Sequence, residues 1–375
     1  MNVILRWLAD LLLRFLRSLD LPLLAALLAL MGVGLAVLYS AGSESSRLVL
    51  TQGAYFGIGL VALWLVSRMP AHLLKQVTPA VYAVSMVPMV LVLFIGTGKY
   101  GNHWIDLGVF NFQPSELAKL TLPMMLAWHL DRRSLPPDLR SLGIALVILA
   151  LPVALILLQR DLGTAVLVLA SGVFVLFLAG LSWWWFATVG AAGIAGFGLA
   201  MFAPITWFSF LRPYQQDRIL TFRNPDNDPM GAGWNILQSQ IAIGGGGLTG
   251  KGWGKGTQSH LDYLPEHTTD FVFSVLAEEF GWVGVVGVLA LYLVVIGRCL
   301  WIAAGSRDSY SRLLAGALGL ALFVYVLVNG GMISGLLPVV GVPMPLLSRG
   351  GTSSIALLAG FGVVMALRAQ RSRHR

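Results

Sequence analysis

Charged residues are scarce in this chain of 375 residues: they make up 11% of it, whereas hydrophobic residues make up 57%. An ordinary soluble domain carries about 25% charged residues, so this chain cannot cover its surface with water-facing groups. The composition excludes a soluble globular protein. It predicts a single lipid-embedded domain over residues 1–375.

Cysteine is nearly absent as well. Cys299 is the only one, so the chain can form neither an internal disulfide nor a cysteine metal cluster. None of the six histidines is followed by Glu, which excludes the zinc-protease motif. No ligand spacing specifies a metal site, and the metal ligands, if any, are unknown from the sequence.

Apolar runs of membrane-spanning length recur along the chain, and a transmembrane helix needs about 20 such residues. The eight longer runs are 21–39, 50–66, 79–95, 144–158, 162–179, 183–201, 282–302 and 313–333. Two shorter runs, 117–130 and 355–367, complete ten expected spans. The expected fold is therefore all-α, a polytopic transmembrane helix bundle with both termini on one side.

Basic residues orient this bundle. With a cytoplasmic N-terminus, the inner segments carry fifteen of the 25 Lys and Arg residues. Of the other ten, five lie in one long outer connection, where the positive-inside rule weakens, and five lie in short outer segments. Fifteen basic residues in the inner segments against five in the short outer segments predict that both termini are cytoplasmic. The net charge of +8 then reflects membrane topology, with no nucleic-acid binding.

Two polar segments lie outside the expected spans. Residues 1–20 place Arg and Asp at helical spacing between Leu, Trp and Phe, which predicts an amphipathic helix on the inner membrane surface, with a partner site as the alternative. A signal peptide is not expected there. Residues 207–269 form a long Gly-rich and Pro-rich outer connection between spans 7 and 8. Loops of this length are usually functional, and its aromatic residues predict that it folds back onto the membrane surface.

The outer connection contains a weak phosphate-binding signal. Residues 245–251 read G-x-x-x-x-G-K, but Gly252 follows instead of Ser or Thr and no strand precedes them, so ATP binding is not expected. The dense glycines, with Lys251 and Lys255, can still present backbone amides to a phosphate or pyrophosphate. Plain loop flexibility is the alternative.

Charged residues at the outer ends of the spans are the candidates for chemistry, because charges near lipid usually face the protein interior or a cavity. Glu116 and Lys119 begin the fourth span on one helix face, either as a structural ion pair or as functional groups. Asp161 opens the sixth span and is either a helix cap or a functional group.

Asp270 ends the long connection where an apolar segment resumes. A carboxylate at that point can reach both an aqueous groove and the bilayer edge. Partial desolvation raises a carboxylate's pKa toward the range useful for a general base. We therefore interpret Asp270 as a general base acting on the polar end of a lipid substrate, with a helix N-cap as the alternative.

Five segments together form a highly specific pattern. They are 113–119 (QPSELAK), 161–164 (DLGT), 212–215 (RPYQ), 231–273 and 335–343 (GLLPVVGVP). Over nearly its whole length the chain resembles the shape, elongation, division and sporulation (SEDS) family. Residues 257–266 look more like RodA, the elongation type, than FtsW, the division type.

The resemblance implies a peptidoglycan glycosyltransferase of the bacterial inner membrane that polymerises lipid II during cell elongation and rod-shape maintenance. It implies a catalytic role for Asp270, and it marks Glu116, Lys119 and Asp161 as functionally sensitive positions. It also implies a divalent cation, Mg²⁺ or Mn²⁺. The implied partner is a class B penicillin-binding protein, the transpeptidase of the elongation machinery.

Three positions depart from the family pattern. The family usually carries His directly before Thr-Asp, whereas His267 here stands one residue earlier, so no role is transferred to it. Arg160 stands where Pro is common, and Arg349 stands where Tyr is common. Both add cations near the outer face and leave the assignment intact.

The expected mechanism starts with Asp270 deprotonating the sugar 4-hydroxyl of an acceptor lipid II. That oxygen attacks the anomeric carbon of a donor glycan on undecaprenyl pyrophosphate, and a single displacement inverts the anomeric centre. Cations must offset the departing pyrophosphate. The candidates for substrate binding, by position and charge, are Lys119, Arg212, Arg218, Lys251 and Lys255, beside a bound metal.

Two functions of other classes stay open from the sequence. A lipid II flippase also places charges inside a bundle, but it needs polar groups through the full membrane depth, whereas nearly all of them here lie in the outer half. A non-catalytic scaffold for a penicillin-binding protein predicts that Asp270 can be replaced harmlessly. Within the family, the FtsW-type division paralogue is the alternative.

Overall fold

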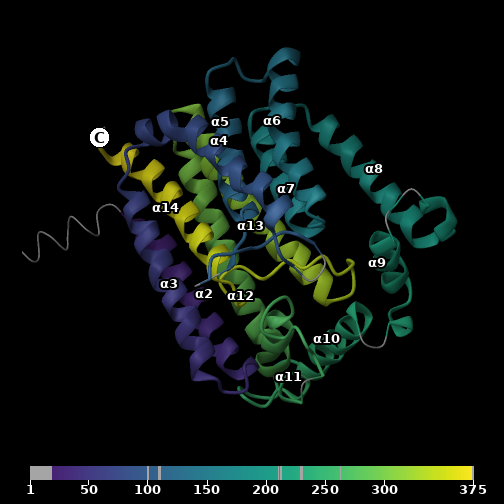
Figure 1. Ribbon diagram of the computed structural model, residues 1–375. Coiled ribbons are helices and arrows are strands. Elements are labelled where there is room, and N and C mark those ends of the chain that lie inside the picture. Colours follow the sequence, from purple (N-terminus) through teal and green to yellow (C-terminus); the bar gives the residue numbers. More distant parts are fainter. Residues whose placement is uncertain are drawn as a thin grey trace, which may run out of the picture.

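The computed structural model describes residues 19–98, 101–108, 111–209, 211, 213–228, 231–261 and 263–373. Within these residues the chain is a helix bundle (Figure 1), which confirms the all-α fold class. The long described helices, each overlapping one expected span, are α2 Leu21–Ala41, α3 Ser46–Ser67, α4 Ala71–Ile95, α5 Ser115–Asp131, α6 Leu139–Leu158, α7 Leu162–Leu178, α8 Trp183–Phe202, α12 Val272–Ala304, α13 Ser309–Ile333 and α14 Gly351–Arg373.

Eight helices of the described part are long and apolar enough to cross a membrane. The two others of the long set are α7, an apolar helix of 17 residues, and α5, also of 17 residues, which carries Glu116 and Lys119. The count of ten spans and the cytoplasmic N-terminus stay predictions. The predicted amphipathic segment 1–20 lies outside the described residues except for Leu19 and Asp20.

Aspartates fix the starts of several helices. Asp20, Asp138, Asp161 and Asp308 each accept a hydrogen bond from the backbone amide three residues later, at the N-termini of α2, α6, α7 and α13. Each bond satisfies one of the orphan donors of a helix N-terminus. The capping interpretation of Asp161 is therefore confirmed.

Small residues let two helices of distant sequence pack closely. Along α14, Gly362 lies so near α3 that a Cβ atom there would come within 2.6 Å of the Leu63 carbonyl oxygen. Such close backbone approach through glycine is a common basis of helix packing in membranes. It brings the C-terminal helix beside α3 (Figure 1).

The eighth expected span, 282–302, was too short, because α12 already begins at Val272. The helix is broken at Gly281, whose φ of 60° and ψ of −159° favour glycine. The freed backbone groups bind the glycine-rich loop 247–252. The carbonyls of Glu278 and Glu279 accept from the amides of Lys251 and Gly252, at 3.0 Å each. A broken helix is tolerated at membrane depth where such partners replace its own bonds.

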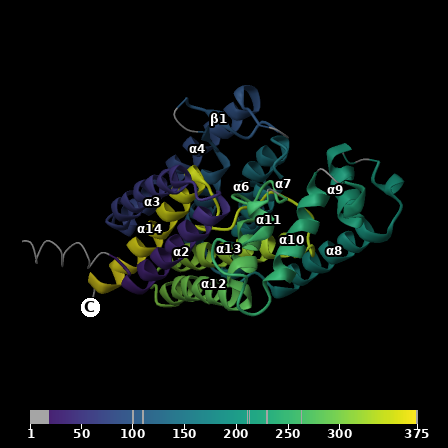
Figure 2. The ribbon, with the colours of Figure 1, turned by 90° about the horizontal axis from the view of Figure 1, so that it is seen from below.

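The outer connection is folded into short helices that gather at one end of the bundle. These are η1 Ile205–Phe208, α9 Pro213–Arg223, η2 Pro225–Asn227, α10 Ala232–Gly246 and α11 Thr257–His260. Figure 2 looks at that end and shows α9 to α11 there, with the small hairpin of β1 Ile105–Asp106 and β2 Asn111–Phe112. Helix α10 packs on α12, and Ser239 on it donates to the Ile333 carbonyl at the end of α13.

A buried carboxylate ties three helices together at the opposite end. Asp20 is 0% exposed and accepts from Arg298 of α12 and Arg368 of α14, at 2.9 Å each. It also caps α2. The Asp20 side chain thus joins α2, α12 and α14, which correspond to the first, eighth and tenth expected spans.

Replacing Asp20 by Ala is expected to destabilise the fold by about 3 kcal/mol, because loss of one partner of a buried ion pair leaves charges uncompensated. Thermal unfolding in detergent measures the loss. Asp308→Ala, which removes a helix cap that forms no ion pair among the described residues, is the matched control and should lose about 1 kcal/mol. Equal losses in the two variants would show that the ion pairs add nothing.

Candidate active site

Asp270 closes a series of turns directly before α12. The turns run through 264–271, where the amides of Thr269 and Phe271 both donate to the Glu266 carbonyl. The side chain of Asp270 lies against Gly341, where a Cβ atom would stand 3.6 Å from Asp270 Oδ2. Gly341 has a φ of +72°, a conformation that glycine adopts readily. The 341–349 segment therefore approaches the carboxylate closely.

The environment of Asp270 disfavours its charged form. Burial, followed by the negative charges of Glu266 and Asp161, raises the pKa of Asp270 to about 7. Desolvation and neighbouring like charges both penalise an ionised carboxylate. A group with such a pKa exchanges protons readily near neutral pH, as a general base requires.

Asp161 is held in place by two bonds. Its Oδ1 accepts from the Thr164 amide at 2.9 Å, and its Oδ2 accepts from Gln113 Nε2 at 2.9 Å. Gln113 directly precedes α5, so Asp161 links the start of α7 to the start of α5. It lies within electrostatic range of both Asp270 and Tyr325. The structure thus brings Asp161 together with Asp270.

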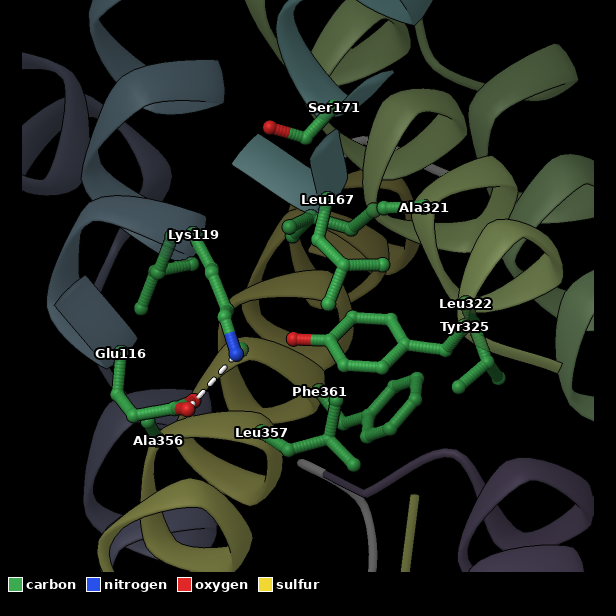
Figure 3. A pocket seen from close by; sticks show the side chains of 13 residues that line it. Glu116, Lys119, Leu167, Ser171, Ala321, Leu322, Tyr325, Ala356, Leu357 and Phe361 are labelled. Carbon is green, nitrogen blue, oxygen red and sulfur yellow. Dashed lines mark hydrogen bonds and ion pairs between the residues drawn. The ribbon is translucent and has the colours of Figure 1, made fainter. Parts of the chain in front are cut away.

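Glu116 and Lys119 form an ion pair of 2.7 Å on one face of α5, with side chains only 6% and 12% exposed. The predicted shared face is therefore correct. Figure 3 shows the Lys119 ammonium between the Glu116 carboxylate and the Tyr325 hydroxyl. The ammonium lies 5.1 Å from the centre of the ring of Tyr325, which belongs to α13. Sequence reasoning missed Tyr325, which lies inside an apolar run.

These three side chains and Ser171 are the polar lining of an otherwise apolar pocket with about 540 Å³ of empty space, which includes space open to solvent. Its wall comes from α5, α7, α13 and α14 (Figure 3). A second, smaller pocket, also open to solvent, shares Glu116, Tyr325 and Leu357 with the first and is lined further by residues of 343–348. The 341–349 segment, which lies against Asp270, therefore also lines this second pocket. The pocket adjoins the Glu116–Lys119 pair.

The other predicted cations are placed differently. Lys251 is paired with the fully buried Glu278 at 2.6 Å and also donates to Thr257 Oγ1. Lys255 is exposed and follows the glycine-rich loop 247–252. Arg218 of α9 has a buried Nη1 without a hydrogen-bond partner among the described residues. Arg212 lies outside the described residues.

Glu278 and Glu279 have partners within the protein. Glu278 Oε1 accepts from the Thr257 amide and hydroxyl at 2.9 Å each, and Glu279 accepts from the Ser40 hydroxyl of α2. In the part of the chain that the structure describes, no three His, Cys, Asp or Glu side chains form a group that could hold a metal ion. The described side chains alone therefore form no such metal site.

The family comparison agrees with this geometry. The model of the cell cycle protein family of FtsW, RodA and SpoVE matches residues 18–373. The chain belongs to this family. It is thus a multi-pass membrane protein, and the FtsW/RodA/SpoVE assignment confirms the resemblance found in the sequence.

Relatives and solved structures cover nearly the whole chain. The peptidoglycan glycosyltransferase MrdB of Escherichia coli K12 is 46% identical, with 94% of each chain covered. The Rod shape determining protein RodA of Thermus thermophilus aligns at a TM-score of 0.69 with 30% identity, covering 95% of this chain and 98% of that one. A chain from a peptidoglycan synthase complex that coordinates polymerization and crosslinking aligns at 0.79 with 32% identity, covering 94% and 98%.

Proposed function

We propose that this chain is a RodA-type peptidoglycan glycosyltransferase that polymerises lipid II at the outer face of the bacterial inner membrane. The observation that carries the proposal is Asp270, a partly buried carboxylate with a pKa of about 7 beside the 341–349 segment. The name of the MrdB relative, which is 46% identical, supports the reaction class. The RodA structure supports a role in rod shape and cell elongation.

In the proposed reaction, an Asp270 carboxylate oxygen takes the proton of the acceptor's sugar 4-hydroxyl. The 4-oxygen of the acceptor sugar, freed of its proton, forms a bond to the anomeric carbon of the donor glycan. The bond from this carbon to undecaprenyl pyrophosphate breaks in the same step, and the pyrophosphate leaves with the electron pair. A carboxylate with a pKa near the working pH is suited to this transfer because it is a strong enough base while about half of it is ionised.

Lys119 is the cation best placed to offset negative charge inside the bundle. Among the described residues that line the first cavity it is the one Lys or Arg, and its surroundings are otherwise mainly apolar. A cation in a water-excluded site stabilises developing charge more strongly than one in water. Lys251 is less suited, because Glu278 already pairs with it.

A divalent cation and a transpeptidase complete the proposal. Mg²⁺ binds proteins through few carboxylates when substrate phosphates and water complete its shell, so the pyrophosphate would supply most of its ligands here. The partner is a class B penicillin-binding protein. The structural relative from a complex of polymerization and crosslinking supports that pairing.

Purified chain in vesicles with fluorescent lipid II tests the proposal. We expect glycan polymer to form, and we expect a chelator of divalent cations to slow it until Mg²⁺ is restored. The apolar cavity would also suit a flippase, so the orientation of the labelled lipid is followed in the same vesicles. Translocation of lipid without polymer would replace the glycosyltransferase by a flippase. Absence of both, with the penicillin-binding protein bound, would indicate a scaffold.

A further inference from the structure

Three consecutive carbonyl groups of the turn that carries Asp270 are all hydrogen-bonded. The Thr268 carbonyl accepts from the Arg349 amide at 2.9 Å, and the Thr269 carbonyl accepts from the Ser348 hydroxyl at 2.5 Å. The Asp270 carbonyl accepts from Asn329 Nδ2 at 2.8 Å. The backbone of this turn is therefore held from outside, by the 348–349 segment and by α13.

Asn329 differs from the other two donors because it joins two segments at once. Its Nδ2 also donates to the Val342 carbonyl at 2.8 Å. Val342 directly follows Gly341, the residue against which the Asp270 carboxylate lies. One side-chain amide thus sets the distance between the backbone of the proposed base and the segment that packs against its side chain.

The orientation of this amide is fixed by its surroundings. Asn329 is 0% exposed, and its Oδ1 is buried without a hydrogen-bond partner among the described residues. Turning the amide over would place Oδ1 against two carbonyl oxygens and leave both without a donor, which is costly in a buried site. The observed bonds use both hydrogens of the NH₂ group. An Asn inside an apolar helix run is itself costly near lipid, so a packing role alone would be served better by Leu.

We propose that Asn329 is a positioning residue for Asp270, which holds the base at the distance from the 341–343 segment that the transfer step requires. The inference rests on the proposed function, since it acts through the base. Its effect falls on the chemical step because a misplacement of about 1 Å can cost about 100-fold in rate. Substrate binding away from the turn is unaffected.

Steady-state polymerisation of fluorescent lipid II tests the inference, with rates normalised to folded protein from size-exclusion chromatography. Asn329→Leu keeps the volume and removes both donated bonds. We expect its kcat to fall by about 10- to 100-fold, with KM within about threefold of the wild-type value. Asn329→Asp, which presents oxygen to both carbonyls, should lose at least as much.

Ser239→Ala is the matched control. Like Asn329, Ser239 is fully buried and donates to a carbonyl outside its own helix, that of Ile333 on α13. Its other partner, the Ser274 hydroxyl, lies on α12 beyond the Asp270 turn. We expect this variant to lose stability and to keep kcat. A similar fall in kcat in Ser239→Ala, or a normal kcat in folded Asn329→Leu, would overturn the inference.

Two further variants keep the result decisive. If Asn329→Leu does not fold, Asn329→Ser replaces it, since a hydroxyl can donate to only one of the two carbonyls, and a wild-type kcat in that variant overturns the inference. Asp270→Asn is measured alongside. Full activity in Asp270→Asn defeats the proposed function itself, whereas an inactive Asp270→Asn with fully active Asn329 variants defeats only the positioning role.

Discussion

Asp270→Asn is expected to lower the rate of glycan polymerisation by about 100- to 10,000-fold, the usual contribution of a general base. Asn has nearly the same shape and fits beside Gly341 as Asp270 does, but it cannot take a proton from the sugar hydroxyl. Polymer length and initial rate with fluorescent lipid II measure the loss. Glycan chains formed at the wild-type rate would remove Asp270 from the mechanism.

The pH dependence of the wild-type rate follows from the same carboxyl. Because burial and two neighbouring carboxylates raise its pKa to about 7, the base becomes protonated as the pH falls through 7. We expect kcat/KM to fall about tenfold per pH unit below that value. A residual rate in Asp270→Asn should lack this acidic limb. A wild-type profile that stays flat down to pH 5 would contradict the assignment.

The Asp270→Asn variant should be more stable than the wild type at alkaline pH. The folded pKa of Asp270, about 7, lies above the ordinary value of 3.8. Between about pH 4 and pH 7 the folded chain therefore binds one proton more than the unfolded chain, so the wild-type fold loses stability as the pH rises. An Asn side chain does not ionise, so the variant does not lose stability in this way. We expect a higher Tm for Asp270→Asn at pH 8 and no difference at pH 4.

Local sequence patterns predicted the site only where its contacts are local. The Glu116–Lys119 pair and the Asp161 cap each join residues three positions apart, so helical geometry alone places them. The apolar runs likewise predicted the helices, because a span must satisfy its backbone bonds internally. The start of α12 was missed, since its first turns contain the acidic pair Glu278 and Glu279 and resemble a loop end.

Contacts between distant segments were not readable from the sequence. Tyr325 meets Lys119 across some 200 positions, and Asn329 meets Asp270 across 59 positions. Such pairs depend on how the helices pack. The sequence did indicate that Asn329 has a partner, because a polar amide within an apolar run needs one. It did not indicate which residue that partner is. The sequence predicted Lys251 as a phosphate ligand, whereas in the structure it is paired with Glu278.

Lys119→Met is expected to lower kcat by about 100- to 1,000-fold, similar to the loss of one preorganised charge donor at a reacting centre. The single variant also leaves Glu116 as an unpaired buried carboxylate, which costs about 3–5 kcal/mol of stability. The two effects would be confounded in any assay of activity alone. Glu116→Gln has the converse problem, since it leaves the Lys119 ammonium without its counter-charge.

The double variant Glu116→Gln with Lys119→Met separates these effects, because it removes both charges and leaves no unpaired ion in the cavity. Its Tm should return to within a few degrees of the wild-type value, since replacement of a buried ion pair by neutral residues is often neutral for stability. If Lys119 acts on the substrate, the folded double variant stays as inactive as Lys119→Met. If the pair serves only to join α5 to α13 through Tyr325, activity returns together with stability. We expect the first result, because an ion pair that only held helices together would not need an open cavity beside it.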